Sequence, residues 1–185
     1  MGKNQKSFAI SDTHFCHNKK FIYEARGFSS IEEHDETLIK NWNEDVSWDD
    51  TVYHFGDVCF KPETSIDRIL PRLNGKKVLI MGNHDMNKKL FQYFDKVVSI
   101  FVRGGYEENS EFVLTHVPIH PMQLEGRWKD AINLHGHLHP GNDQTKIQQL
   151  GERYFNVNCE LHGLRPLTFQ QVRDKIREIR RQKCH

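Results

Sequence analysis

The chain has 185 residues, of which 37% are hydrophobic and 28% are charged, and its formal net charge is +1. This is the balance of an ordinary globular protein, so a disordered class is excluded and we expect a single domain over residues 1–185. The small net charge also excludes an overall electrostatic attraction to nucleic acid or to a membrane surface, so any preference for anions has to come from a local site.

Short apolar runs alternate with helical patterns in the first half of the chain, which favours an α/β fold. Ser29 and Ser30 are each followed three residues later by a glutamate, a capping-box signature for the start of a helix. Pro71 lies inside a second helical pattern and is expected to disturb its last turn. In chain order we predict a strand over residues 7–11, a helix from Ser29 or Ser30 to about Val46, a strand over 51–55, a helix over 66–73 and a strand over 77–81.

The second half of the chain is predicted to hold further strands and one long helix. The strands cover residues 97–102, 111–115, 131–134 and 153–158, with a hairpin or loop at 103–106. The helix begins at Thr168 as N-cap, and Gln171 completes its capping box. Its outer face is basic, which is compatible with a nucleic-acid contact, although a solvated helix face is the preferred interpretation.

The cysteines and the N-terminal segment bear on the compartment. Cys16, Cys59, Cys159 and Cys184 are too far apart for a Cys-x-x-Cys motif. This spacing argues against a disulfide framework or a zinc knuckle and suits a reducing cytoplasm. The first residues lack the apolar stretch of a signal peptide or a membrane span, so we expect a cytoplasmic protein without membrane association.

Residue types that commonly bind metals follow five of the predicted strands. In open α/β sheets, ligands bind beyond the carboxyl ends of the strands, so these side chains are expected to converge in one crevice. They are, in chain order, Asp12, His14, Asp57, Asn83, His84, Asp85, His116, His137 and His139.

This mixture of nitrogen and oxygen donors has a chemical meaning. Two divalent cations roughly 3.5–4 Å apart can clamp the attacking and leaving oxygens of a phosphoryl displacement. A carboxylate has two oxygens and can bridge such a pair, while neutral imidazoles and an amide oxygen complete the coordination. The donor set favours manganese, iron, zinc, cobalt or nickel over magnesium, which prefers oxygen ligands alone.

Five stretches occur together in one order between residues 12 and 139. They are Asp12-Thr13-His14, Gly56-Asp57, Gly82-Asn83-His84-Asp85, His116 and Gly136-His137-Leu138-His139. In these stretches the sequence resembles the calcineurin-like metallophosphoesterase family. Three further stretches resemble a compact bacterial and phage branch of that family, namely Phe15-Cys16-His17, Arg26-Gly27-Phe28 and Asn41-Trp42-Asn43.

The resemblance implies a fold, a metal centre and a catalytic group. The fold would be two facing mixed β-sheets flanked by helices, a four-layer αββα sandwich. Two divalent cations, expected to be Mn²⁺, would be held by Asp12, His14 and His139 and by Asn83, His116 and His137, with Asp57 as the bridge. His84 would stabilise charge or protonate the leaving group, and Asp85 would orient His84.

Several other polar residues have two interpretations. His17 is expected to border the metals or contact phosphate, and Arg26 to bind phosphate through its guanidinium, although an ordinary surface arginine is equally compatible. His54 is taken as a structural residue that faces outward from its strand. Asn158 and His162 follow a late strand, and a structural role is preferred for both. The insert between His116 and Gly136, in particular residues 123–128, is the expected specificity loop.

These expectations converge on hydrolysis of a phosphodiester, and also of a phosphomonoester, through a metal-activated water. The substrate would be a phosphorylated small molecule or a nucleotide, and nothing indicates nucleic acid. A Ser/Thr protein phosphatase is the alternative enzyme. A non-catalytic scaffold with the same fold is a third hypothesis, but it requires lost ligands, and all seven predicted ligands are present.

Overall fold

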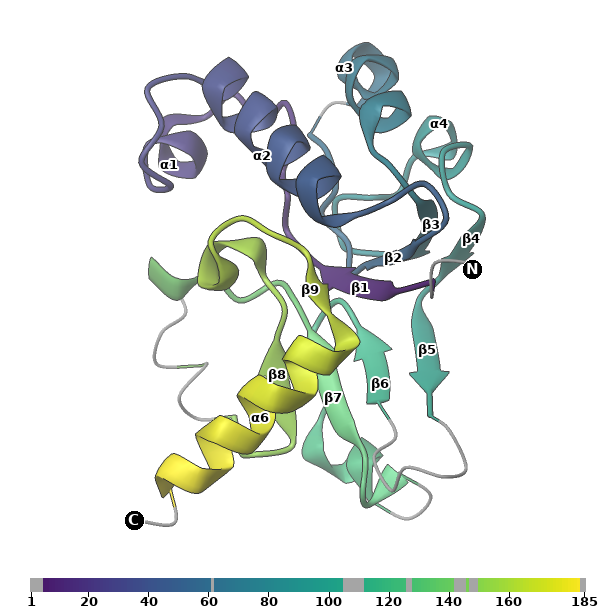
Figure 1. Ribbon diagram of the computed structural model, residues 1–185, viewed down its shortest axis with the longest axis vertical. Helices are drawn as coiled ribbons and strands as arrows, with labels where there is room; N and C mark the ends of the chain where they lie inside the picture. The colour runs from purple at the N-terminus through teal and green to yellow at the C-terminus, as the bar shows by residue number, and fades with distance from the viewer. Residues whose placement is uncertain are drawn as a thin grey trace.

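The computed structural model describes residues 5–60, 62–104, 112–125, 128–141, 146 and 150–183. Its first sheet has the strand order β4-β3-β2-β1-β9 (Figure 1). Strands β1 to β4 pair in parallel, and β9 is antiparallel to β1. The bounds of these strands are Ser7–Ile10 for β1, Thr51–His54 for β2, Lys76–Ile80 for β3, Lys96–Val98 for β4 and Leu167–Thr168 for β9.

The second sheet has the order β5-β6-β7-β8. Strands β6, β7 and β8 are parallel, whereas β5 is antiparallel to β6. Both sheets are therefore mixed, as predicted. The bounds are Ile100–Arg103 for β5, Phe112–Thr115 for β6, Ile132–His135 for β7 and Tyr154–Asn156 for β8.

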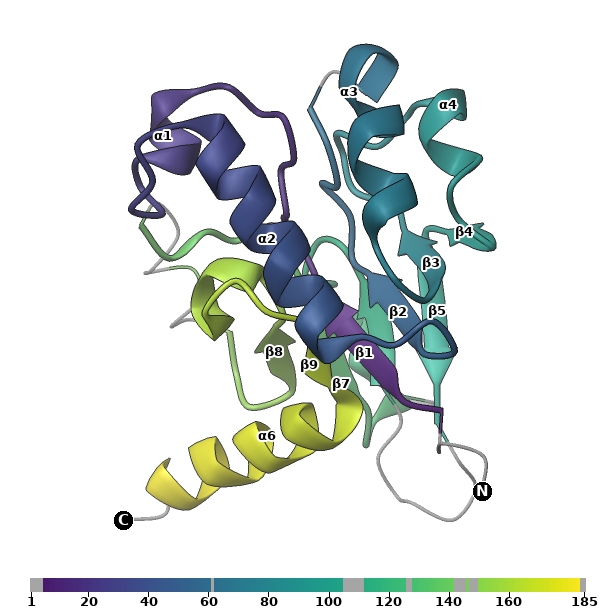
Figure 2. The same ribbon diagram turned by 45° about the horizontal axis from the view of Figure 1, so that its top comes forward.

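Helices flank the two sheets, so the predicted fold class is confirmed. Helices α1 to α4 lie beyond the first sheet, and α6 runs beside the second sheet towards the C-terminus (Figures 1 and 2). None of the helices in the described part of the chain is long and apolar enough to cross a membrane. The α-helices are α1 (Lys20–Tyr23), α2 (Ile31–Asp45), α3 (Pro62–Ile69), α4 (Lys88–Phe91) and α6 (Phe169–Lys183); the 3₁₀ helices are η1 (Leu70–Arg72), η2 (Pro121–Leu124) and η4 (Cys159–His162).

The alternation of side chains along the strands distributes the buried apolar residues of the described chain over three clusters. In β1, Phe8 and Ile10 pack with α2 and α3, whereas Ala9 points into the core between the sheets. In β6, Phe112 faces the inter-sheet core, and Val113 packs on the opposite face against Leu124 of η2. Because successive side chains point to opposite faces, both sheets bury apolar residues on two sides.

The helix boundaries follow the capping signals in the sequence. The Ser30 hydroxyl accepts from the Glu33 backbone N–H at 3.1 Å, and the Glu33 carboxylate accepts from the Ser29 N–H at 3.0 Å. Thr168 and Gln171 form the same reciprocal pair at the start of α6. These bonds satisfy backbone donors that have no partner inside a helix.

Pro71 has the predicted effect, since the helix before it changes to the 3₁₀ turn η1. The single strand predicted over residues 97–102 is wrong. The structure divides this run into β4, at the edge of the first sheet, and β5, at the edge of the second. The hydrophobic pattern of a sequence does not show that one apolar run pairs with two different sheets. Residues 105–111, which include the second half of the hairpin or loop expected at 103–106, lie outside the described residues.

Candidate metal centre

The loops that follow β1, β2, β3, β6 and β7 meet at one end of the sandwich, and three glycines permit this close approach. A Cβ atom on Gly56 would lie 2.4 Å from the backbone nitrogen of Gly82. A Cβ atom on Gly136 would lie 1.9 Å from Ser11 Oγ and 2.5 Å from Asp12 Oδ2. Only a residue without a side chain fits at these points, which explains why glycine precedes three of the polar stretches.

The backbone is strained where these loops carry their polar side chains. Asp12, His14, Asp57 and His137 have φ angles of 57°, 49°, 54° and 65°, respectively, in the left-handed region. Non-glycine residues are uncommon there, and each such conformation costs of the order of 1 kcal/mol or more. This cost has to be offset by the interactions that the strained residues make.

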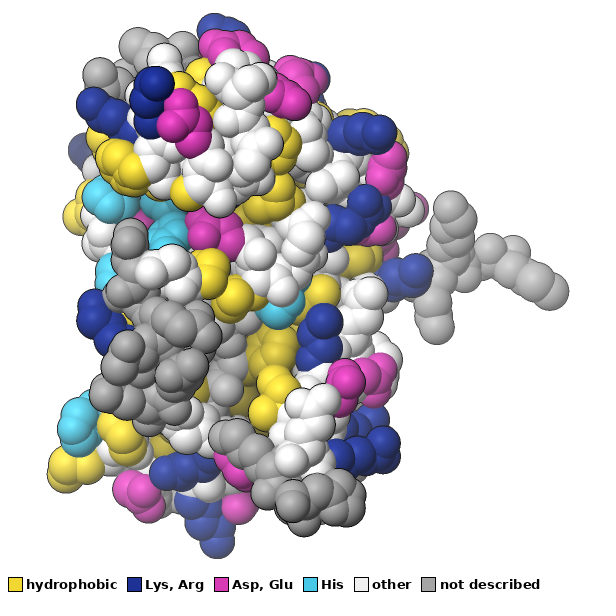
Figure 3. Space-filling model, turned by 90° about the vertical axis from the view of Figure 1, so that its left-hand side faces the viewer, with side chains coloured by type: hydrophobic (Ala, Val, Ile, Leu, Met, Phe, Trp, Pro, Cys, Tyr) yellow, Lys and Arg dark blue, Asp and Glu magenta, His cyan; other side chains and the backbone are white. Residues whose placement is uncertain are grey.

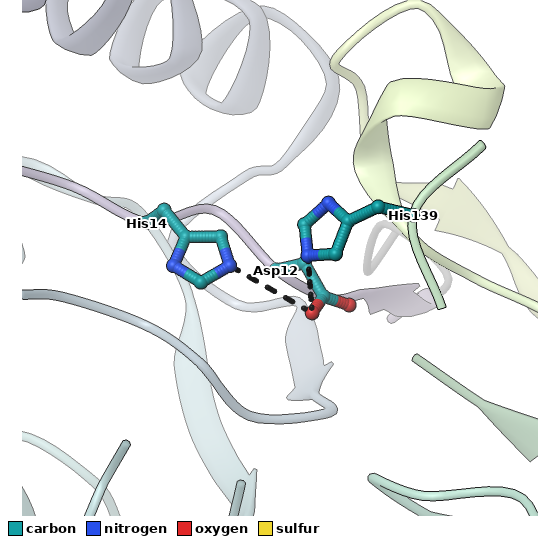
Figure 4. A group of neighbouring side chains, drawn as sticks. All are labelled: Asp12, His14 and His139. Carbon is teal, nitrogen blue, oxygen red and sulfur yellow. Dashed lines mark ion pairs between the residues drawn. The ribbon is translucent and has the colours of Figure 1, made fainter. Parts of the chain in front are cut away.

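The first group of side chains consists of Asp12, His14 and His139 (Figure 4). Both imidazole rings turn a nitrogen towards the Asp12 carboxylate, with His14 Nε2 and His139 Nε2 at 3.9 and 3.6 Å from Asp12 Oδ1. These distances are too long for hydrogen bonds. Asp12 Oδ1 and His14 Nε2 are buried and have no hydrogen-bond partner. Buried polar atoms are nearly always paired, so this pair of atoms indicates a ligand between them.

The second group consists of Asp57, His116 and His137, with Asn83 beside them. His116 Nδ1 lies 2.6 Å from the Phe55 carbonyl, which can only accept, so this nitrogen carries the ring proton of neutral His116. The lone pair on His116 Nε2 then faces Asn83 Oδ1 at 3.1 Å and Asp57 Oδ1 at 3.5 Å. Acceptor atoms that face one another need a cation between them, and these residues fit one.

Asp57 lies between the two groups. Its Oδ1 is the atom near His116, and its Oδ2 lies 3.9 Å from His14 Nε2. His137 also connects the groups, because its backbone N–H donates to Asp12 Oδ2 at 3.0 Å while its Nδ1 lies 3.2 Å from His116 Nε2. The predicted division into two sets of ligands therefore corresponds to the spatial grouping of these side chains.

The electrostatics of the first group also fit a cation. Burial raises the pKa of Asp12 to about 6, against the weaker opposing effect of nearby histidines. Burial, with help from the Arg26 charge, lowers the pKa of His14 well below its ordinary value. Neutral His14 offers a lone pair, and a divalent cation would restore the charged form of Asp12 that burial disfavours.

Asp85 was predicted to orient His84, but among the described residues its carboxylate bonds to the main chain and makes no hydrogen bond to the His84 ring. Its carboxylate accepts from the backbone N–H groups of Asp57, Val58 and Gly82 at 2.7, 3.0 and 2.7 Å. A carboxylate can accept several such bonds, so Asp85 ties the loop after β3 to the loop after β2. It holds the two backbones that carry Asn83, His84 and Asp57 rather than the His84 ring.

His84 and Asn83 are exposed, whereas Asp57 and His116 are buried. The His84 ring centroid is 6.3 Å from that of His14, and the His84 backbone N–H donates to Asp57 Oδ1 at 3.2 Å. Figure 3 shows histidine side chains gathered in the upper half of one face, next to acidic and hydrophobic side chains. The imidazole of His84 is thus both close to the ligands and open to solvent.

The two predicted substrate residues lie near the ligands in different ways. His17 stacks on Phe60 with 4.0 Å between ring centroids, and its ring is 5.4 Å from that of His14. Arg26 also lies behind the ligands, but its side chain is only 2% exposed and donates to the backbone carbonyls of Asp12 and Thr13. This placement does not support a phosphate contact by Arg26.

Of three other residues, His54 differs from its expected position, His162 agrees with its preferred role and Glu160 was missed. His54 does not face outward: it is buried, donates through Nε2 to Thr13 Oγ1 at 3.0 Å and accepts at Nδ1 from the Gly56 N–H. Burial lowers its pKa to about 3. His162 has the preferred structural role, because its Nε2 lies 2.8 Å from the Asn156 carbonyl. Glu160, which contacts His139, was not predicted, because nothing in its local sequence marks it as part of a site.

The expected specificity loop is partly core. Leu124 of η2 is buried against Val113 and Ala131, whereas Gln123 is exposed. Residues 126–127 lie outside the described residues. Asn158 is also buried, and it caps η4 by accepting from the Glu160 N–H at 3.0 Å.

Comparison with known proteins agrees with the geometry. A family model described as calcineurin-like phosphoesterase matches residues 6–180. The chain belongs to this family. An uncharacterized protein of Methanocaldococcus jannaschii is 32% identical over 91% of this chain and 89% of its own length. The Gene 66 protein of Mycobacterium phage L5 is 26% identical over 91% of this chain and 93% of its own length.

A solved structure of a protein of unknown function from Aquifex aeolicus has a TM-score of 0.69 and 24% identity. The match covers 92% of this chain and 99% of the Aquifex chain, and it supports the fold. The family membership makes the chain a phosphoesterase, and the two groups of side chains are its candidate metal sites.

Gly136→Ala should both destabilise the protein and weaken metal binding, because the new methyl group would push the Ser11–Asp12 segment away from His137. We expect a loss of about 1–3 kcal/mol in the free energy of unfolding, measured by urea denaturation. Gly141→Ala is the control, since a Cβ atom there meets nothing within 4 Å. It should change stability by no more than about 0.5 kcal/mol. Equal effects of the two changes would contradict the close-approach explanation.

Proposed function

We propose that this chain is a two-metal phosphodiesterase that also hydrolyses phosphomonoesters, by attack of water at phosphorus. The observation that carries the proposal is the convergence of lone-pair atoms from Asp12, His14, Asp57, Asn83, His116, His137 and His139. Two divalent cations bound there would supply Lewis acidity and lower the pKa of the attacking water. Manganese is the expected ion, because it accepts both imidazole and carboxylate ligands.

In this proposal Asp12, His14 and His139 would hold one cation, while Asn83, His116 and His137 would hold the other. Asp57 would contribute to both sites, which its position supports, because its two oxygens face different groups. The buried carboxylates keep the ligand sphere fixed before substrate arrives. Such preorganisation avoids reorganisation when charge develops on the phosphoryl oxygens.

His84 is proposed as the group that stabilises this charge or protonates the leaving oxygen. Its exposed imidazole lies on the same loop as Asn83, and Asp85 holds that loop against the Asp57 segment. His17 is proposed to border the first cation site, since its ring is close to that of His14. Arg26 is left out of the substrate site because its donors are already used by protein acceptors.

The exposure of Asn83 and His84 supports a diester substrate. A phosphodiester carries an organic group on each side of phosphorus, and both groups need a path to solvent. A phosphorylated small molecule or a nucleotide meets this requirement. The small net charge of +1 gives no electrostatic support for a long nucleic acid.

A substrate comparison tests the proposed activity. The Mn²⁺-loaded protein should hydrolyse bis-p-nitrophenyl phosphate with a higher kcat/KM than p-nitrophenyl phosphate or a phosphoserine peptide. A chelator should abolish the activity and added Mn²⁺ should restore it. Activity on the phosphopeptide alone would replace this proposal with a protein phosphatase.

Asp57→Asn should remove most metal binding and most activity, because an amide lacks the charge and the second oxygen ligand of a bridging carboxylate. Metal content by elemental analysis and turnover of bis-p-nitrophenyl phosphate measure the two effects. Asp49→Asn is the matched control, since Asp49 is exposed and precedes β2, whereas Asp57 follows β2. Stoichiometric metal and full activity in Asp57→Asn would eliminate the bridging role.

His84→Ala should retain both metals and lose about 10²–10⁴-fold in rate, the range for removal of a general acid or base. The loss should be smaller on a substrate with a good leaving group, because such a group needs no proton. Elemental analysis and kcat for a series of aryl phosphodiesters test both points. Loss of a metal ion in this variant would mean that His84 is a ligand.

A further inference from the structure

Four buried or half-buried polar side chains form a continuous hydrogen-bonded chain behind the first group of ligands. The chain runs from Glu160 in η4 through Arg26 and His34 to Asp35 in α2. None of these residues lies in the loops that provide the metal ligands, and none falls in the stretches that resemble the family's metal-binding motifs. Their hydrogen bonds nevertheless reach those loops at three points.

The first point is His139. Its Nδ1 lies 2.8 Å from Glu160 Oε1, and the same oxygen accepts from Arg26 Nε and Nη2 at 2.9 and 2.6 Å. A carboxylate that accepts from a guanidinium is ionised, so His139 Nδ1 is the nitrogen that carries the proton. The Nε2 lone pair is thereby directed at the space beside Asp12 Oδ1, 3.6 Å away.

The second point is the strained segment that follows β1. Arg26 Nη2 donates to the Asp12 carbonyl at 2.7 Å, and Nη1 donates to the Thr13 carbonyl at 2.9 Å. These carbonyls belong to a segment in which Asp12 and His14 both have left-handed backbone angles. The guanidinium has a rigid planar set of donors, so it holds both carbonyls in a defined position.

The third point is Cys16, the next left-handed residue of that segment. Arginine only donates, so His34 Nε2 accepts from Arg26 Nη1 at 2.8 Å, and His34 Nδ1 donates to Asp35 Oδ1 at 2.8 Å. Asp35 Oδ2 then accepts from the Cys16 N–H at 3.0 Å. Each bond fixes the direction of the next, from the ligand His139 to the end of the strained segment.

We propose that Glu160, Arg26, His34 and Asp35 form a positioning network that serves only the cation held by Asp12, His14 and His139. The inference rests on the proposed two-metal function. Within the described residues, the hydrogen bonds of the four side chains reach the segments of Asp12 and His139, and none of them reaches Asn83, His116 or His137. The network touches neither substrate nor reacting atoms.

The second cation site is supported differently. His116 is oriented by the main-chain carbonyl of Phe55, and Asn83 is carried by the loop that Asp85 ties down. A neutral carbonyl gives the ring less electron density than a carboxylate does. Removing the charge of Glu160 should therefore affect one cation and spare the other, a selectivity that general destabilisation would not produce.

The test uses Glu160→Gln in the full-length chain, with Mn²⁺ as the probe. In a His116→Ala background only the first cation site remains, and in a His14→Ala background only the second. Titration calorimetry should show that Glu160→Gln weakens Mn²⁺ binding about 10–100-fold in the first background. Binding in the second background should be unchanged. Glu178→Gln, an exposed change on α6, is the control and should alter neither.

Arg26→Lys is the second variant, since lysine keeps the charge but cannot reach two carbonyls and Glu160 together. It should show the same selective loss. Equal weakening in both backgrounds, or none in either, overturns the network. Hydrolysis is measured separately on the unmutated chain. If that chain is active and its Glu160→Gln variant binds both ions normally, the network is refuted and the proposed function is not. A protein that binds two ions and shows the selective loss but cleaves no phosphoester refutes the function alone.

Discussion

The structure depends on one constraint, which is the packing of several lone-pair atoms from distant segments at one end of a two-sheet sandwich. Such atoms repel one another and lose their hydration when buried. The chain brings them together with three glycines, left-handed backbone at four ligand residues and a carboxylate that ties two loops. Each of these features is unfavourable or unusual alone, and together they fit a site that would bind cations.

Much of this could be predicted from the sequence because the signals are local. When a predicted strand is followed by Gly-Asp or Gly-Asn-His-Asp, the sequence indicates both the position of the turn and the metal-binding residue types that come after it. The parallel arrangement of β1, β2 and β3 then brings their ends to one edge. The capping boxes at Ser30 and Thr168 are local in the same way, and they gave helix starts that the structure reproduces.

The remainder depended on long-range contacts that leave no local mark. Glu160 contacts Arg26 across 134 residues of sequence, and Asp85 bonds to backbone groups 27 and 28 residues away. The family resemblance implied that Asp85 orients His84, and nothing in the local sequence indicates the backbone partners that Asp85 has in the structure. The division of residues 97–102 between two sheets has the same origin.

The buried side chains of Asp12 and His14 also connect metal binding with folding. Burial disfavours the charged form of Asp12 and the protonated form of His14, so the empty set of ligands is costly to assemble. An ion that binds the folded chain and not the unfolded chain offsets this cost by mass action. The strain and desolvation are therefore what we expect of a chain that cations at this candidate site would stabilise. In the proposed function, a cation would stabilise the ionised carboxylate of Asp12, and the exposed His84 would meet the substrate.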